Sequence, residues 1–247
     1  MSDPLLSVLM PFYNERGTLE EIVRRVLAAE AGMPLELVMV NDCSSDGSGE
    51  IARGLAEGDG RIRLVAHERN RGKGAAVRTG IAAAAGTVAV IQDADLEYDP
   101  GEYRRLAAPI LSGEADAVYG SRFLERRLDG ALVRSVLANR VLTGWANFIN
   151  GTRLTDMETC QKAVRMDLLK SLRLTSERFG IEPEITARLA QARARIVEVP
   201  IAYDPRSYAE GKKISWLDGA AALWHVLKFR LAPQREFEGL RTTRQGG

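Results

Sequence analysis

Short apolar runs alternate with helical segments along the first half of the chain. The runs are rich in Val, Leu and Ile, are apolar throughout, and cover residues 5–12, 35–41, 61–67, 87–92 and 116–120. Strands that are apolar on both faces and alternate with helices predict a mainly parallel sheet covered on both sides. The expected fold class is therefore α/β, with a mostly parallel central sheet flanked by helices.

Capping signals mark the starts of the predicted helices in this half. Thr18 is followed three residues later by Glu21, which is the pattern of a capping box. Asp99 precedes Pro100, so Asp99 is the expected N-cap of another helix and Pro100 its first residue. Between them, the Ala-rich segment 73–85 is also predicted to be helical.

The second half has a different pattern. Helices are predicted at 131–150, 182–194 and 216–231, a strand at 195–203, and an irregular or partly extended segment at 155–165. The sequence has no internal repeat and no linker-like stretch. We expect one domain over residues 1–231, made of two parts (1–125 and 126–231), and a disordered polar tail over 232–247.

Composition excludes several classes of protein. With 34 basic and 33 acidic residues the net charge is +1, so no overall field attracts nucleic acid. Cys43 and Cys160 stand far apart, which argues against a disulfide framework or a structural zinc site and fits a reducing cytoplasm. The N-terminus lacks the basic region of a secretory signal, and no uncharged apolar stretch approaches the roughly 20 residues of a spanning helix. Any work at a membrane is therefore expected at its surface or through a partner.

Polar residues follow three of the predicted strands, in the segments 11–15, 41–48 and 92–97. In open α/β sheets, ligands bind beyond the carboxyl ends of the strands, so these segments predict the site. Asp42 directly follows its strand, and a carboxylate there can accept hydrogen bonds from a nucleotide base or ribose.

The segment after the fourth strand is acidic. Asp93, Asp95, Glu97 and Asp99 follow one another at every second position, and carboxylates this close repel unless a cation neutralises them. Asp93 and Asp95 flank Ala94, so both can converge on one divalent cation, with Glu97 as a further ligand. Oxygen ligands favour Mg²⁺ or Mn²⁺, with substrate phosphates completing the shell. The alternative is a solvated acidic turn that opens a helix.

A glycine-rich segment precedes the Ala-rich helix. Gly72 and Gly74 follow a strand and open a helix, and Asp93 lies about 20 residues further on, which imitates a dinucleotide fingerprint. Val77 occupies the third glycine position, and two strand–helix units come before this one. A better interpretation is a loop that carries Lys73 near the site, beside the N-terminus of a helix.

Basic residues and histidines limit the chemistry further. Arg122 follows the fifth strand, and guanidinium groups suit phosphate oxygens. Two histidines, His67 and His225, have no obvious nucleophile as a partner, and no GxSxG motif is present. A Ser-His-Asp hydrolase is therefore not expected.

The order of the motifs resembles that of the family 2 glycosyltransferases, and within them the chain is similar to the dolichyl- and polyprenyl-phosphate sugar transferases. The resemblance extends from about residue 5 to about residue 230 and rests on "SVLMPFYNE", "VMVNDCSSDGS", "NRGKGAAVRTG", "QDADLEYDP" and "YGSRF". It implies a GT-A fold, a nucleotide-sugar donor such as UDP-glucose or GDP-mannose, and a polyprenyl-phosphate acceptor. It also implies Mg²⁺ or Mn²⁺ and a product of inverted anomeric configuration. Residues 1–125 would then hold donor and metal, and residues 126–231 the acceptor.

The resemblance also implies roles for individual residues. Those expected to hold the nucleotide sugar are Pro11, Tyr13, Glu15, Asp42, Lys73, Asp93, Ala94, Arg206 and Lys213. Those expected at the metal are Asp93, Asp95 and Glu97, where similar lipid-phosphate enzymes often have Gln at the third position. Those expected at the reacting groups are Asp95, Arg122, Arg134 and Asp156, with the two arginines on the acceptor phosphate.

Alternatives remain open at this point. A phosphate acceptor is already an anion and needs no strong base, whereas a saccharide hydroxyl would need one, for which Asp156 is the candidate. An NAD-dependent oxidoreductase built on Gly72 and Gly74, and a non-catalytic nucleotide-sugar sensor or recruiting subunit, are the other classes. Residues 214–231 combine Trp and Leu with Lys228 and Arg230, which fits an interfacial helix or a core helix equally.

Overall fold

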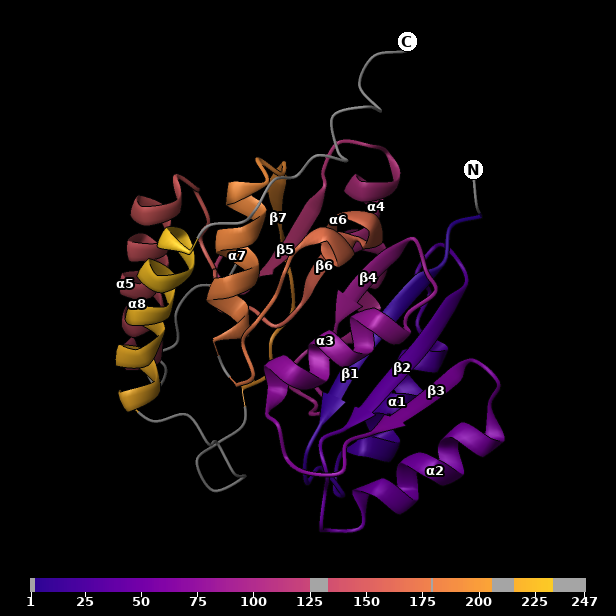
Figure 1. The fold of residues 1–247 in the computed structure, drawn as a ribbon. Coiled ribbons are helices and arrows are strands. Elements are labelled where there is room, and N and C mark those ends of the chain that lie inside the picture. The colour runs from indigo at the N-terminus through magenta and orange to yellow at the C-terminus, as the bar shows by residue number, and fades with distance from the viewer. Residues whose placement is uncertain (1–2, 125–132, 179, 206–215, 233–247) are drawn as a thin grey trace.

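The computed structural model describes residues 3–124, 133–178, 180–205 and 216–232. Within them the chain forms a seven-stranded sheet of order β3-β2-β1-β4-β6-β5-β7, flanked by helices (Figure 1). The strands are β1 (Leu6–Phe12), β2 (Leu35–Asn41), β3 (Ile62–Ala66), β4 (Val88–Ile91), β5 (Ala117–Ser121), β6 (Lys162–Arg165) and β7 (Ile196–Pro200). The helices are α1 (Leu19–Ala28), α2 (Ser48–Gly58), α3 (Lys73–Ala83), η1 (Pro100–Glu102), α4 (Tyr103–Leu111), α5 (Val133–Asn150), α6 (Met166–Ser171), α7 (Ile181–Gln191) and α8 (Trp216–Leu231).

The predicted α/β class and the mainly parallel sheet are confirmed. β6 is antiparallel to both of its neighbours, β4 and β5, and the other strand pairs are parallel. Because β6 reverses direction, β4 and β5 run the same way, and the carboxyl ends of β1, β2, β4 and β5 meet at one edge. The segments predicted to form the site are therefore brought together at this edge.

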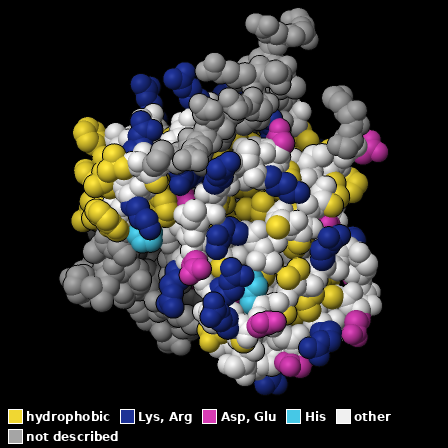
Figure 2. Space-filling model, viewed as in Figure 1, with side chains coloured by type: hydrophobic (Ala, Val, Ile, Leu, Met, Phe, Trp, Pro, Cys, Tyr) yellow, Lys and Arg dark blue, Asp and Glu magenta, His cyan; other side chains and the backbone are white. Residues whose placement is uncertain are grey.

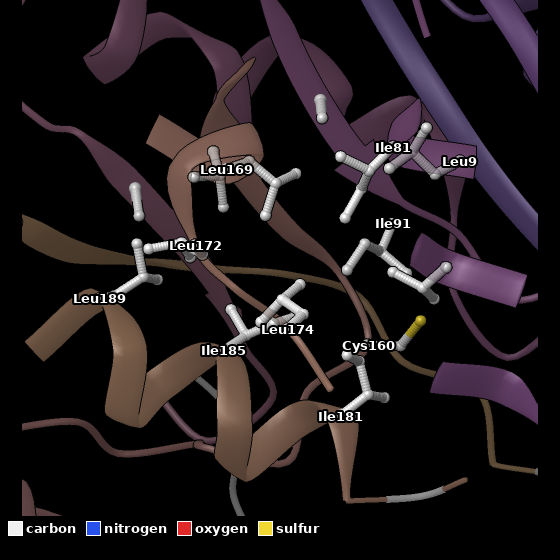
Figure 3. Packing of buried hydrophobic residues seen from close by; sticks show 14 of the residues in the cluster. Leu9, Ile81, Ile91, Cys160, Leu169, Leu172, Leu174, Ile181, Ile185 and Leu189 are labelled. Carbon is white, nitrogen blue, oxygen red and sulfur yellow. The ribbon is translucent and has the colours of Figure 1, made fainter. Parts of the chain in front are cut away.

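Alternation along the strands divides the core into two layers. Leu9 and Ile91 face one layer, formed with α3, α6, α7 and part of α5, whereas Val8 and Met10 face the other, formed with α1, α2 and α4. Figure 3 shows the first layer, in which Ile81 of α3 and Ile185 of α7 pack on the same side of the sheet. Burial on both faces explains why these strands are apolar throughout.

The starts of two helices test the capping predictions. Asp99 is the N-cap of η1 as predicted, with its Oδ1 accepting from the Gly101 amide at 2.9 Å. The capping box at Thr18 is wrong: the Thr18 hydroxyl makes no cap bond, because it donates instead to Glu15 Oε2 and to the Ala94 carbonyl. Thr18 therefore ties the start of α1 to the acidic turn after β4.

The second half of the chain completes the sheet and adds an outer helical pair. β6 occupies the last four residues of the segment expected to be partly extended, and β7 lies within the predicted strand. α5 and α8 lie side by side at the left of the view, beyond α7 (Figure 1). Among the described helices, none has both the length and the apolar character to cross a membrane. The tail from residue 233 lies outside the described residues.

Candidate active site

The acidic segment after β4 begins with an ion pair. Lys73 Nζ, at the start of α3, lies 2.7 Å from Asp93 Oδ1 and 3.2 Å from Glu182 Oε1 on α7. Burial alone would raise the pKa of Asp93, but the ammonium of Lys73 outweighs it and holds this pKa below its usual range. Asp93 is therefore ionised, with Lys73 as its counter-ion in this structure.

The next residues of this segment form a fixed turn. The Ala94 carbonyl accepts from Thr18, and Asp95 Oδ1 accepts from the Glu97 amide at 3.1 Å. Glu97 Oε2 accepts from the hydroxyl of Tyr203, which follows β7, at 2.8 Å. The turn is thus held from α1 on one side and from the end of the sheet on the other.

The predicted metal-binding carboxylates fit a divalent cation only if a bound substrate supplies further oxygen ligands. Among the described residues, no group of three or more His, Cys, Asp or Glu side chains lies close enough to form a protein-only metal cage. Mg²⁺ is ordinarily held by one or two carboxylates together with substrate phosphates and water. Asp95 and its neighbours Asp93 and Glu97 offer the carboxylate oxygens for such a site, and a nucleoside diphosphate would supply the remaining ligands.

The loops after β1 and β2 are bonded to each other. Asn14 has a positive φ of 55°, and its amide donates to Ser44 Oγ while its side-chain oxygen accepts from the Ser45 amide. The Glu15 amide donates to Ser48 Oγ at 2.9 Å. Of the residues predicted around the nucleotide, Pro11 is buried within β1, and Tyr13 is 40% exposed at the start of the loop that follows it.

Asp42 has an internal role that the sequence did not predict. Its Oδ1 accepts from the Arg71 amide and lies 2.7 Å from His67 Nδ1, and its Oδ2 accepts from the Gly72 amide. The other ring nitrogen of His67 lies 2.9 Å from Thr79 Oγ1. Asp42 therefore anchors the glycine-rich loop, and only its spare lone pairs are left for a base or ribose.

Gly72 and Gly74 have a packing role. A Cβ atom on Gly72 would lie 2.4 Å from the Glu177 carbonyl oxygen, and one on Gly74 2.5 Å from that of Ser176. The Glu177 carbonyl also accepts from the Ala75 amide, one of the free donors at the start of α3. These glycines let the loop before α7 approach the helix, which explains them without a dinucleotide.

Arg122 and Asp156 form a buried bidentate pair. The Arg122 guanidinium donates to Oδ2 at 2.6 Å and to Oδ1 at 2.7 Å, and the Arg122 amide also donates to Oδ2. Asn139 of α5 donates to Oδ1 at 3.0 Å, and the Glu198 carboxylate accepts from the Asp156 amide. Burial would raise the pKa of Asp156, but Arg122 more than offsets this and holds it below the usual range. Such a group is a weak base, and its role here is to hold the guanidinium.

Tyr203 joins the acidic and the basic parts of the site. Its hydroxyl donates to Glu97, and its ring lies 5.0 Å from the Arg122 guanidinium carbon. It also packs against Tyr98 with ring centroids 5.1 Å apart. The acidic turn after β4 and the arginine after β5 are therefore parts of one site.

Sequence interpretation missed two buried charges behind this site, Lys162 and Glu182, which lie near Glu158. Lys162 is fully buried, and its ammonium bonds to Glu182 and the Thr159 carbonyl and lies 4.9 Å from the centre of the Tyr119 ring. Glu158 has a buried Oε1 that makes no hydrogen bond with any residue the structure describes. Burial, and then the nearby charge of Glu182, raise the pKa of Glu158 to about 7. The sequence signal for Lys162 is a lysine beside the two apolar residues of β6, Ala163 and Val164.

Three predicted residues cannot be placed. Arg206 and Lys213 lie outside the described residues, and Arg134 is on the first turn of α5 but its side chain is not described. Their contacts with phosphates remain predictions.

Comparison with solved structures defines the class of fold. Glucosyl-3-phosphoglycerate synthase from Mycobacterium tuberculosis, in complex with phosphoglyceric acid, superposes with a TM-score of 0.70 at 23% identity. The match covers 94% of this chain and 82% of that chain. The predicted GT-A type of α/β fold is thereby confirmed.

Comparison with sequence families identifies the family. The Glycosyl transferase family 2 model matches residues 7–173, and this chain belongs to that family. Undecaprenyl-phosphate 4-deoxy-4-formamido-L-arabinose transferase of Edwardsiella ictaluri is 31% identical over 84% of this chain and 62% of its own length. Dodecaprenyl-phosphate galacturonate synthase of Rhizobium johnstonii is 29% identical over 84% of this chain and 61% of its own length. The predicted resemblance to polyprenyl-phosphate sugar transferases is confirmed, although the chain spans less than two thirds of these relatives.

Proposed function

We propose that this chain transfers a hexose, with inversion, from a nucleotide sugar such as UDP-glucose or GDP-mannose to a polyprenyl or dolichyl phosphate. The observation that carries the proposal is the link through Tyr203, which contacts both Glu97 of the acidic turn and Arg122. A donor diphosphate with its cation and an acceptor phosphate need opposite charges side by side, and this arrangement supplies them. The names of the two prenyl-phosphate relatives support the acceptor class.

Asp95, with Asp93 or Glu97, is proposed to hold Mg²⁺ or Mn²⁺ against the donor diphosphate. A solved neighbour of the same fold was crystallised with Mn²⁺ and UDP, which supports a divalent metal here. The cation would supply positive charge to the leaving diphosphate. Lys73 neutralises Asp93 at 2.7 Å, and its ammonium would contact the same diphosphate if Asp93 held the metal.

The proposed reaction needs no strong base. An oxygen of the acceptor phosphate attacks the anomeric carbon, the bond from that carbon to the diphosphate oxygen breaks, and the nucleoside diphosphate leaves. Arg122, held by Asp156 and with Arg134 as a second cation, is proposed to orient the attacking phosphate. Because the acceptor lipid lies in a membrane, the protein is proposed to work at its cytoplasmic surface.

The alternative is the same transfer to a saccharide hydroxyl with Asp156 as base. The bidentate contact with Arg122 and the lowered pKa of Asp156 disfavour it. The oxidoreductase alternative loses its main support, because Gly72 and Gly74 are explained by packing against Glu177 and Ser176.

A turnover assay tests the proposal. Purified protein is incubated with Mg²⁺ or Mn²⁺, a short-chain polyprenyl phosphate and one radiolabelled donor at a time: UDP-glucose, GDP-mannose, and nucleotide derivatives of the two sugars named for the relatives. We expect an organic-extractable labelled product that is lost with chelator and in Asp95→Asn. A donor that is consumed only with a saccharide acceptor, or not at all with any lipid phosphate, would overturn the proposed acceptor.

A further inference from the structure

A short segment before β6 connects the two charged parts of the site. At one end of it, Asp156 holds the Arg122 guanidinium in the bidentate contact described above. At the other end, Cys160 Sγ lies 3.6 Å from the Lys73 ammonium. Glu158 is the middle residue of this segment. It therefore lies between the arginine proposed to hold the acceptor phosphate and the lysine proposed to contact the donor diphosphate.

Glu158 has no partner of its own in the described part of the chain. Its Oε1 is buried without a hydrogen bond, although the residue as a whole is only half-buried. The cations near it are bonded to other carboxylates, Lys162 to Glu182 and Arg122 to Asp156. Burial does most to raise the pKa of Glu158, and these four charges act on it as well. A buried carboxyl group without a hydrogen bond is costly, which points to a ligand as its partner.

The transferred sugar would lie beside this carboxyl group. In the proposed reaction the acceptor phosphate at Arg122 attacks the anomeric carbon, and the diphosphate that leaves lies near Lys73 and the acidic turn. The sugar therefore lies between these two groups, as Glu158 does, and this step rests on the proposed function. The hydroxyl groups of a sugar ring are the hydrogen-bond donors that the carboxylate lacks.

We propose that Glu158 selects a donor with a neutral sugar, because its carboxylate accepts a hydrogen bond from a ring hydroxyl and repels the carboxylate of a uronic acid. Two like charges roughly 5 Å apart in a protein site disfavour each other by on the order of a hundredfold in binding. Lys162 does not cancel the charge of Glu158, because Glu182 already neutralises its ammonium. Glu158 thus acts on the choice of donor, and the diphosphate and the acceptor are held by other residues.

Other charges do not make this selection. Lys73 neutralises Asp93, and Arg122 neutralises Asp156, so these two acids do not repel a further anion as Glu158 does. Figure 2 shows Lys and Arg side chains spread over the face of the molecule that carries α3 and α7 in Figure 1. An additional negative charge on the donor is attracted to such a surface. Discrimination against an acidic sugar therefore has to arise inside the site.

Donor binding tests this selection without any acceptor. The full chain is titrated calorimetrically with Mg²⁺ and two matched pairs of probes, UDP-glucose with UDP-glucuronate and GDP-mannose with GDP-mannuronate, whose members differ only at C6. The titration is done at about pH 8.5, where Glu158, with its pKa of about 7, is ionised. In the pair whose nucleotide binds, we expect the neutral member to bind at least about tenfold more tightly.

Two substitutions separate Glu158 from acidity in general. In Glu158→Gln the preference for the neutral member should fall to roughly threefold or less, mainly because the uronate binds more tightly. Glu114→Gln, which removes an exposed carboxylate, should keep the preference of the unsubstituted protein. The nucleoside diphosphate alone should bind equally to all three proteins, which shows that the site is folded in each.

The outcomes distinguish this inference from the proposed function. Equal binding of the two members of a pair by the unsubstituted protein would overturn the inference, and so would an unchanged preference in Glu158→Gln. Weaker binding of the nucleoside diphosphate itself by Glu158→Gln would also overturn it, because Glu158 would then support the site as a whole. A preference that depends on Glu158, without transfer to any lipid phosphate, would overturn the proposed acceptor and keep the selection. Binding of neither pair would overturn both.

Discussion

Lys73 Nζ lies between two carboxylates from different parts of the chain, 2.7 Å from Asp93 and 3.2 Å from Glu182. Asp93 follows β4 and Glu182 lies in the first turn of α7, so one ammonium joins the acidic turn after β4 to the second half of the chain. Burial would lower the pKa of Lys73, but Asp93, Cys160 and Glu182 raise it well above its usual value, and the cation is permanent.

Replacing this cation should destabilise the fold as well as the site. Lys73→Met leaves two partly buried carboxylates without their shared counter-ion, and loss of one partner of a buried pair costs roughly 3–5 kcal/mol. Because Lys73 is 19% exposed, we expect the lower end of that range in urea unfolding. The matched control is Lys170→Met, an exposed lysine that donates to the Ala84 carbonyl, and its loss should cost less than about 1 kcal/mol. Equal losses of unfolding free energy in Lys73→Met and Lys170→Met would contradict a structural role for the contacts of Lys73 with the two carboxylates.

The glycine at the start of α3 should tolerate no side chain. In Gly74→Ala the new methyl group meets the Ser176 carbonyl at 2.5 Å, and overpacking of this kind typically costs about 1–3 kcal/mol. Gly54→Ala on α2 is the control, because a Cβ there has nothing within 4 Å, and alanine should stabilise the helix by about 0.5–1 kcal/mol. In chemical denaturation, we expect the free energy of unfolding to decrease in Gly74→Ala and to increase in Gly54→Ala. Tight binding of a nicotinamide cofactor that Gly74→Ala abolishes would instead support a dinucleotide site.

Much of this fold could be predicted from the sequence because its strands are buried on both faces. Val88–Ile91 is apolar at every position, which predicts a strand, whereas β6 carries Lys162 and Arg165 in four residues and its pattern predicts only a partly extended segment. Lys162 is compatible with a central strand because its ammonium contacts the Thr159 carbonyl and also Glu182 and Tyr119, which are distant in the chain. The sequence of β6 and its neighbours in the chain does not show that these distant partners are present.

The buried ion pair of Arg122 and Asp156 should contribute more to the free energy of unfolding than an exposed ion pair does. Asp156→Asn removes the charge that neutralises a guanidinium with a 14% exposed side chain, and we expect a loss of roughly 3 kcal/mol in urea unfolding. Its control is Asp167→Asn, whose partner Arg165 is 35% exposed, and which should cost less than about 1 kcal/mol. Because the pKa of Asp156 is lowered in the folded protein, its contribution is present above the unfolded pKa and disappears as pH falls through the folded value.

Activity separates the two roles considered for Asp156. If it positions Arg122, Arg122→Lys and Asp156→Asn should both reduce turnover on a lipid phosphate by about a hundredfold or more, because the bidentate contact is lost in each. If it were a base, Arg122→Lys would retain most of the turnover and only Asp156→Asn would abolish it.

The sequence indicates the acidic turn after β4, but not the residues that contact its carboxylates. The positions of Asp93, Asp95 and Glu97 follow from a strand that ends in carboxylates, a local feature of the sequence. The role of Asp42 in holding the loop at Arg71 and Gly72, and that of Tyr203 between Glu97 and Arg122, depend on which strands are neighbours. Those contacts arise from the order of the sheet, which a single sequence does not specify.

Glu158 should make the stability of the protein depend on pH near neutrality. Its buried Oε1 has no hydrogen-bond partner in the described part of the chain, and burial together with the charge of Glu182 raises its pKa to about 7, against 4.5 as its ordinary value. A raised pKa means that the contribution is fully present below the unfolded pKa and is lost as pH rises through the folded pKa. From pH 5 to pH 8 the free energy of unfolding of the unsubstituted protein should therefore fall by on the order of 3 kcal/mol. That of Glu158→Gln should not show this fall. Urea unfolding of both proteins across this range measures the difference, with the exposed Glu114→Gln as the control. A difference between Glu158→Gln and the unsubstituted protein that stays constant from pH 5 to pH 8 would show that Glu158 is already ionised in the folded state.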